Sequence, residues 1–426
     1  MARDKMIVGE NVTFSTDPAV TGLNNNVIVC AGTGAGKTMS VIEPRLLETY
    51  NSSLVVTVSK RRIVKDYTPL LRSRDYGIFD LNLADPASAT VFFDPLKYIK
   101  TTRDIKMLAE AIVLADYKDS THYDPYWSQS SVSLLSAEIA LVLTRNIHAG
   151  IDDLMSFHQK IFVAESSSDI IQTSVDDDFL ELPNGKFSEY ALTCWRTFRS
   201  APIRTASCIF STLNAVLDNI FTPEIRQAAR TKRTLDLRRI AERKTVVFVT
   251  VSPVNTALSR YVDLLYSTLF KELFEYSQES PDGKLPNPVS VLCDDFAAGG
   301  SIPDFAKYIS IFRESDISVT LLLQSESQLA SIYGKNDSTT IINNCDTYIY
   351  MGGNDIDTCR SVSIKMNVPL EDVMFMPVGE EIVFRRGSRP KMTTRYNIAA
   401  DKRYIALNKE LKKRKSRTNS AECRSS

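Results

Sequence analysis

The sequence lacks any hydrophobic run close to the about 20 residues that a membrane-spanning helix needs. It also has no secretory signal peptide, because its first 17 residues lead almost directly into a glycine-rich stretch. Its apolar share of 43% and charged share of 24% are typical of a soluble globular chain. We therefore expect a soluble protein. If it works at a membrane, either another chain holds it there or a segment has been removed.

Patterns for disulfides and metal sites are also missing. The seven cysteines are an odd number with no C-x-x-C pair, and the three histidines, at 122, 148 and 158, lie far apart. Scattered cysteines favour a reducing compartment, which indicates the cytoplasm. Histidines at this spacing favour structural roles over a metal site.

Neither sign of charge is in excess, because 51 basic residues balance 51 acidic ones. Any contact with nucleic acid must therefore come from local patches. Two basic patches occur, at 226–244 and in the tail that starts at 401. For the first, we favour a solvated helix face. We expect the tail to be disordered; it would bind nucleic acid, acidic lipid or a partner, or simply keep the chain soluble.

The sequence does contain a candidate phosphate-binding loop, AGTGAGKT, at 31–38. It follows the apolar run 27–30, which is typical of a buried strand, and precedes a predicted helix at 39–50 that Pro44 would kink. The pattern G-x-x-x-x-G-K-[ST] matches at every position but the first, where alanine replaces glycine. The alternative is a glycine-rich turn that binds no phosphate; the Lys-Thr ending and the preceding strand disfavour it.

Each part of this loop has an expected role. Small residues let backbone N–H groups face inward and cradle phosphate oxygens, together with the N-terminus of the following helix. Lys37 would contact the β- and γ-phosphates, and the Thr38 hydroxyl would bind Mg²⁺. The residues predicted to contact the nucleotide are Gly32, Thr33, Gly34, Ala35, Gly36, Lys37 and Thr38.

Three further positions are candidates for chemistry. An apolar run ends in Asp294 and Asp295; at such a strand end the first acid holds Mg²⁺ and the second polarises the attacking water. Gln324, at another strand end, would sense the γ-phosphate, and Arg313 would contact a neighbouring subunit's nucleotide. The alternatives are loop acids that cap a helix, a satisfied turn amide and an exposed arginine.

Strand and helix patterns alternate along the chain, which predicts an α/β fold with a mostly parallel central sheet. Buried-strand patterns occur at 53–58, 244–253, 289–296, 317–325 and 346–352. Between about 103 and 240 the apolar spacing is helical and strand patterns are sparse. We therefore predict a sheet domain formed by 1–103 and 241–400, an inserted all-α domain at 104–240, and the basic tail at 401–426.

Together these segments make the chain resemble the coupling proteins of type IV secretion and conjugation, which are RecA-like P-loop ATPases. The resemblance covers roughly residues 25–395. It rests on the order and spacing of six segments: the loop 31–38, FFDPL at 92–96, DPYW at 124–127, LCDDF at 292–296, the stretch 302–334 and NNCDTYIYMGGND at 343–355.

This resemblance implies a RecA-like domain interrupted by a helical domain that recognises cargo. It implies an ATPase that uses ATP and Mg²⁺, forms homo-hexamers when active and is possibly monomeric in isolation. The implied partners are single-stranded DNA, a relaxase, and channel and membrane-anchor proteins. The chain would be cytoplasmic and peripheral to the inner face of the membrane. Carried over by position, Lys37, Asp295, Gln324 and Arg313 are catalytic, and Thr38 and Asp294 hold the metal.

Three departures from the family pattern are visible. Family members usually carry an N-terminal membrane anchor, which we do not find. The second acid is commonly glutamate, and Asp295 is shorter by one methylene; displacements of about 1 Å can cost on the order of a hundredfold in rate. The family often has aspartate where this chain has Ser59. These departures keep two alternatives open: a nucleotide-switched adaptor with little hydrolysis, and a general DNA translocase or packaging motor, which the 302–334 segment disfavours.

Overall fold

The computed structural model describes residues 4–114, 125–161, 163–164, 172–252, 257–294, 296 and 301–425. The chain forms two compact units. The sheet unit consists of Met1–Asp80, Asp236–Val251 and Phe270–Ser426, and the helical unit consists of Leu81–Leu235 and Ser252–Leu269. The expected insert at 104–240 overlaps the helical unit, and the assignment of domains stays a proposal.

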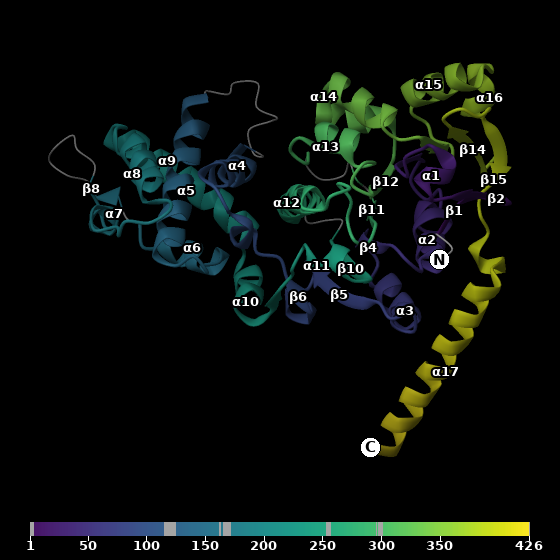
Figure 1. Ribbon diagram of the computed structural model, residues 1–426, viewed down its shortest axis with the longest axis horizontal. Coiled ribbons are helices and arrows are strands. Elements are labelled where there is room, and N and C mark those ends of the chain that lie inside the picture. Colours follow the sequence, from purple (N-terminus) through teal and green to yellow (C-terminus); the bar gives the residue numbers. More distant parts are fainter. Residues whose placement is uncertain are drawn as a thin grey trace. The chain divides into compact units, whose positions relative to one another are not determined.

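Within the described residues, nine strands form one sheet with the order β15-β14-β13-β3-β12-β11-β4-β10-β5 (Figure 1). Strand β13 and strands β3, β12, β11, β4 and β10 run parallel. Strand β14 pairs antiparallel with both β13 and β15, so it alone is reversed among the strands with a known register. The predicted α/β fold is thereby confirmed. The bounds are β3 Val27–Cys30, β4 Ser53–Val58, β5 Gly77–Asn82, β10 Thr245–Thr250, β11 Val289–Cys293, β12 Ile317–Leu323, β13 Thr347–Tyr350, β14 Glu380–Arg385 and β15 Lys391–Thr394.

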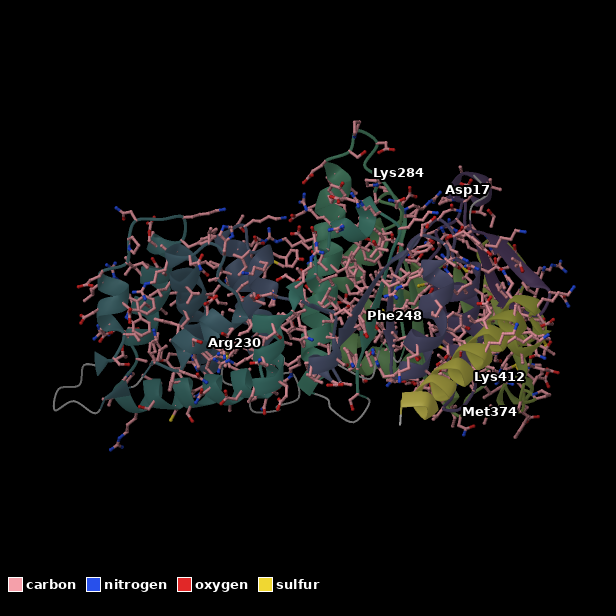
Figure 2. All side chains as sticks on the ribbon, turned by 90° about the horizontal axis from the view of Figure 1, so that it is seen from below. Asp17, Arg230, Phe248, Lys284, Met374 and Lys412 are labelled. Carbon is pink, nitrogen blue, oxygen red and sulfur yellow. The ribbon has the colours of Figure 1, made fainter. Side chains whose placement is uncertain are left out.

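The central strands are buried along their whole length, and this explains their composition. Every residue of β3, β4, β10, β11, β12 and β13 is buried. Strands of a parallel sheet that is covered on both faces read as continuous apolar runs. Phe248, which is 0% exposed, lies inside the sheet unit (Figure 2). The hydrophobic core therefore holds the carboxyl edge of the sheet in place.

The remaining elements of the sheet unit are mostly helices. A small hairpin, β1 Lys5–Gly9 and β2 Val12–Ser15, precedes them. The helices are α1 Pro18–Thr21, η1 Thr38–Ile42, α2 Glu43–Glu48, α3 Arg61–Arg72, α11 Arg239–Glu242, α13 Phe305–Ile311, α14 Glu326–Asn343, α15 Ile356–Met366, α16 Leu370–Met374, η5 Ile398–Ala400 and α17 Lys402–Ser425. Helix α12, Ala257–Gln278, contributes residues to both units.

The helix after the glycine-rich loop begins with a π-helical turn. In η1 the Glu43 N–H bonds to the Thr38 carbonyl, five residues back. Pro44 follows and has no N–H, so it cannot complete the usual bond to the carbonyl four residues back. The irregularity that Pro44 predicts is therefore present, and it lies within one turn of the loop.

The helical unit packs its helices around aromatic side chains. Trp195 stacks on Phe179 with ring centroids 4.0 Å apart, and Pro202 separates α8 from α9, as expected of a proline. The helices are α4 Thr102–Val113, α5 Pro125–Arg145, α6 Ile151–His158, α7 Asp176–Leu180, α8 Ser188–Arg199, α9 Ile203–Ile220 and α10 Pro223–Thr231. Short pieces complete the unit: η2 Pro86–Ser88, η3 Pro95–Tyr98, β6 Val91–Phe92, β7 Val163–Ala164, β8 Gln172–Thr173 and β9 Arg233–Thr234.

The basic tail differs from the expected disorder, because helix α17 occupies Lys402–Ser425 (Figure 1). Lysine, arginine, leucine, alanine and glutamate, which favour helices, are frequent in this segment. Leu407 is 5% exposed and belongs to the core of the sheet unit, with Tyr404 and Leu411 packed against it. Charge content predicts a solvated chain, but two leucines and a tyrosine at helical spacing anchor the first turns.

The described residues offer neither a membrane-spanning helix nor a cluster of metal ligands. None of the helices there is long and apolar enough to cross a membrane. Nor does that part of the chain contain a group of three or more His, Cys, Asp and Glu side chains that could hold a metal ion.

Candidate nucleotide-binding site

The glycine-rich loop 31–38 joins the carboxyl end of β3 to η1. Gly34 and Gly36 have φ angles of 77° and 81°, in the left-handed region that side chains disfavour. The Gly32 N–H donates to the Gly352 carbonyl at 2.8 Å, just beyond the end of β13. The loop is therefore a wrapped backbone turn fixed to the neighbouring strand, as a phosphate cradle requires.

Lys37 and Thr38 follow the wrapped part of the loop. The Lys37 ammonium donates to the Ala31 carbonyl at 2.7 Å, so the side chain folds back over the loop. The Thr38 hydroxyl donates to Asp294 Oδ2 at 3.1 Å. Hydroxyl and carboxylate oxygens are ligands that Mg²⁺ prefers. Two residues predicted separately as metal ligands therefore meet at one point, because β3 and β11 end at the same edge of the sheet.

Arg395 holds the loop through hydrogen bonds to backbone carbonyls, and the sequence analysis did not predict this role. Its guanidinium donates to the Ala35 carbonyl through Nη1 and to the Met351 carbonyl at 2.7 Å through Nη2. One side chain thus joins the loop to the end of β13. Arg395 lies one residue beyond β15. A lone arginine after a short strand matches no motif, so no sequence signal was available to find it.

A buried acid lies near Arg395. Glu381 on β14 is 1% exposed, and neither of its carboxyl oxygens has a hydrogen-bond partner in the described part of the chain. Burial raises the pKa of Glu381 to about 8, although the positive charge of Arg395 opposes the rise. Burial also lowers the pKa of Arg395, and Glu381 opposes that change. An acid that titrates near neutral pH, Glu381, therefore lies close to the arginine that holds the loop.

A cavity of about 480 Å³ opens beside the loop. Its lining comes from the first turn after the loop, from the start of α3 and from α17: Thr38, Met39, Glu43, Lys60, Arg62, Asp66, Tyr404 and Asn408. Glu43 is fully buried, and it accepts hydrogen bonds from Tyr67 at 2.8 Å and from Arg62. Burial, and then the Glu43 charge, raise the pKa of Tyr67 well above its usual value. This pair of bonds fixes the wall that faces the loop.

A family model described as "Type IV secretory system Conjugative DNA transfer" matches residues 1–366. The chain belongs to this family. The model covers the loop, the end of β11 and β12, so Lys37, Thr38 and Asp294 lie inside the matched region. Glu381, Arg395, Tyr404 and Asn408 lie beyond it. A search of the curated proteins finds no match.

Solved structures show that this conjugative DNA-transfer protein has a P-loop fold of the RecA type. The bacterial conjugative coupling protein TrwBdeltaN70, in a trigonal form with sulphate, is 16% identical with a TM-score of 0.65, over 87% of this chain and 85% of that chain. The plasmid coupling protein TrwB in complex with ADP and Mg²⁺ is 15% identical with a TM-score of 0.64, over the same 87% and 85%. VirB4 of Thermoanaerobacter pseudethanolicus is 12% identical with a TM-score of 0.56, over 95% of this chain and 98% of that chain.

The other predicted catalytic residues of this conjugative DNA-transfer protein lie in different places. Gln324 is exposed directly after β12, at the same edge of the sheet as the loop, and its backbone N–H donates to Gln328 Oε1 at 3.3 Å. Arg313 is exposed in the turn before β12 and therefore lies at the opposite edge. Asp295 lies outside the described residues. The fold thus brings Gln324 to the loop's edge and keeps Arg313 away from the loop of its own chain.

Three arginines of the basic run at 226–244 form ion pairs within the protein. In the helical unit, Arg226 and Arg230 both pair with Asp152, at 3.2 and 2.6 Å. In the sheet unit, Arg238 pairs with Glu272 at 3.1 Å and with Glu279 at 2.7 Å. These contacts favour a structural role for the three arginines over contact with nucleic acid.

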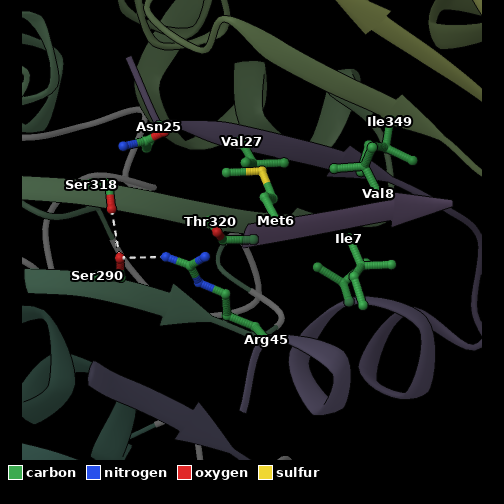
Figure 3. Close-up of a pocket in the computed structure, with 11 residues that line it drawn as sticks. Met6, Ile7, Val8, Asn25, Val27, Arg45, Ser290, Ser318, Thr320 and Ile349 are labelled. Carbon is green, nitrogen blue, oxygen red and sulfur yellow. Dashed lines mark hydrogen bonds between the residues drawn. The ribbon is translucent and has the colours of Figure 1, made fainter. Parts of the chain in front are cut away.

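A second, smaller cavity of about 20 Å³ lies between the hairpin strand β1 and the main sheet (Figure 3). Arg45 reaches into it and donates to Ser290 Oγ at 3.1 Å, and Ser290 is 2.7 Å from Ser318 Oγ. A space of this size holds about one water molecule. We assign the cavity to packing of the hairpin on the sheet.

Proposed function

We propose that this chain is a coupling ATPase of type IV secretion or conjugation. It would recruit a relaxase–DNA or protein substrate to the secretion channel and drive transfer by hydrolysing ATP with Mg²⁺. Family membership supports the conjugative role. The contact of 3.1 Å between Thr38 and Asp294 supports the nucleotide chemistry most directly, because it brings the two proposed Mg²⁺ ligands together beside the glycine-rich loop. Two solved structures of the coupling protein TrwB are complexes, one with ADP and Mg²⁺ and one with a non-hydrolysable ATP analogue.

The proposed mechanism uses positioning and charge rather than covalent chemistry. Backbone N–H groups of the loop and the Lys37 ammonium would hold the β- and γ-phosphates. Mg²⁺ would neutralise phosphate charge beside Thr38 and Asp294. Asp295 would polarise the attacking water, and Gln324 would contact the γ-phosphate from the end of β12.

Arg313 could contact a nucleotide only if a second subunit lies beside the first. Its turn precedes β12, at the edge of the sheet opposite the loop, and this position supports a contact with a neighbouring chain's nucleotide rather than with its own. A homo-hexamer with nucleotide at subunit interfaces would meet this requirement, and a monomer would lack the arginine. We also propose that the region 104–240 recognises cargo, with single-stranded DNA and a relaxase among its partners. Membrane-anchor and channel proteins would place the complex at the inner face of the membrane.

The test is ATP turnover by the purified chain with and without single-stranded DNA, measured beside Lys37→Ala. We expect turnover that rises with DNA and is lost by at least a hundredfold in the variant, because the lysine contacts the transferred phosphate. Nucleotide binding is measured in parallel with a fluorescent ATP analogue. If the wild type binds no Mg-ATP, the proposal is wrong.

The second candidate is a nucleotide-switched adaptor that docks substrates and hydrolyses little. Asp295 favours it, because this side chain is one methylene shorter than the glutamate of the resembling family. Clear Mg-ATP binding without turnover, in the presence of DNA, would select this candidate over the motor.

A further inference from the structure

The cavity beside the loop has one wall that comes from the C-terminal helix. Tyr404 and Asn408 are four residues apart on α17 and therefore lie on the same helix face, and both line the cavity. The opposite lining includes Met39, whose side chain is 45% exposed immediately after the loop. An aromatic ring, an amide and a flexible thioether thus surround a space that begins at Thr38.

The helix wall is held firmly in place. Arg403, next to Tyr404, pairs with Glu48 at the end of α2 at 2.7 Å and with Asp401 at 2.7 Å. Leu407, between the two cavity residues, is 5% exposed in the core of the sheet unit. The position of Tyr404 is therefore fixed by an ion pair on one side and by apolar packing on the other.

The charged side chains that line the cavity are two acids, Glu43 and Asp66, and two bases, Lys60 and Arg62. Arg62 pairs with both acids, with Asp66 at 3.2 Å. Lys60 is exposed, and its side chain has no hydrogen bond or ion pair to any of the described residues. It leaves one positive charge beside Thr38 that an α-phosphate would neutralise.

We propose that this cavity holds the base and ribose of the bound nucleotide, with the Tyr404 ring against the base. The inference rests on the proposed function, because it extends the phosphate site along the same molecule. The triphosphate would occupy the loop, and the nucleoside would continue past Thr38 and Met39 into the cavity. Its volume of about 480 Å³ falls in the range of about 300–1,000 Å³ that small-molecule sites occupy. Aromatic rings stack on every base, so Tyr404 supplies affinity whichever base is bound.

The test compares two ligands, Mg-ATP and Mg-tripolyphosphate, by titration calorimetry on the full chain. Tripolyphosphate presents the phosphates without a nucleoside. We expect Tyr404→Ala to weaken ATP binding by about tenfold or more, the size expected from loss of one stacked base, and to leave tripolyphosphate binding within about twofold. Tyr404→Phe keeps the ring and should bind ATP as the wild type does. Ile405→Ala, which changes the neighbouring residue on the exposed face of α17, is the matched control.

The outcomes distinguish a failure of the proposed nucleoside site from a failure of the proposed nucleotide function. Equal ATP affinity in wild type and Tyr404→Ala would overturn the nucleoside site while leaving the nucleotide function intact. A parallel loss of tripolyphosphate binding would also overturn it, because Tyr404 would then act on the loop rather than on the base. Absence of binding of either ligand by the wild type would overturn the proposed function itself. If Tyr404→Ala does not fold, Asn408→Ala measures the same wall and should weaken only ATP.

Discussion

The two units bury acids in different ways. In the helical unit, Glu138 and His158 are both 0% exposed, and His158 Nδ1 lies 2.9 Å from Glu138 Oε2. In the sheet unit, Glu381 is 1% exposed and has no hydrogen bond to its carboxyl oxygens among the described residues. Glu138 has His158 as a partner, and we assign this buried pair to the packing of the helical unit. The second acid is left unsatisfied next to Arg395, which holds the loop. A buried carboxyl group without a hydrogen bond among the described residues therefore lies near the candidate site, whereas the buried carboxyl group of Glu138 is paired.

Removal of the contact between Glu138 and His158 should give the largest loss of stability. Burial acts to lower the pKa of His158, but the Glu138 carboxylate outweighs it and the pKa is raised. Glu138→Gln removes this partner, and we expect the helical unit to lose about 3–5 kcal/mol, the usual cost of breaking a buried ion pair. Because the pKa of His158 is raised, this stabilisation is complete below about pH 6.5 and fades as the pH rises through the raised pKa. The loss should therefore be larger at pH 6 than at pH 9.

The measurement is hydrogen exchange of peptides from α5 and α6, combined with thermal unfolding at both pH values. Glu189→Gln, an exposed acid on α8, is the control and should have little effect. ATP binding by the sheet unit should not change. A loss below about 0.5 kcal/mol would mean that the pair contributes nothing beyond its volume.

Substitution of Glu381 should change stability less than substitution of Glu138, and the size of the change should depend on pH. The pKa of Glu381 is raised from 4.5 to about 8, so the native state holds a proton that the unfolded state has lost between these values. Stability of the sheet unit should therefore fall as the pH rises from 4.5 to 8 and then level off. Glu381→Gln should remove this fall and make the variant more stable than the wild type at pH 9, on the order of 3 kcal/mol.

Urea unfolding of both proteins between pH 5 and 9 tests this expectation. Glu380→Gln, at the preceding position of the same strand, is the matched control because its side chain is only half-buried. Parallel stability curves for wild type and Glu381→Gln would show that the acid is ionised at no cost. The contrast between the two units would then disappear.

The sequence predicts some residues of the candidate site and not others. Lys37, Thr38 and Asp294 follow apolar runs that predict strands, and parallel strands bring their carboxyl ends to one edge, so their meeting could be anticipated. Arg395 and Tyr404 have no such signal. Arg395 acts through carbonyls of residues far away in the sequence, and Tyr404 lies in a basic segment whose charge content predicts disorder. Their positions depend on tertiary packing, through β15 in one case and Leu407 in the other.

The smallest effect is expected where Arg395 supports the loop without touching the phosphates. Arg395→Lys keeps the charge near Glu381, but a single ammonium cannot reproduce the planar fork that bonds Ala35 and Met351. One lost charge-assisted bond costs on the order of 1–2 kcal/mol, so we expect about a five- to tenfold loss of Mg-ATP affinity. Arg389→Lys, in the exposed turn between β14 and β15, is the control. The affinity loss should be similar for Mg-tripolyphosphate, because the loop and not the nucleoside is disturbed, and this distinguishes Arg395 from Tyr404. Unchanged affinity for both ligands would mean that the loop keeps its shape without the fork, and that the two hydrogen bonds of Arg395 have no part in binding.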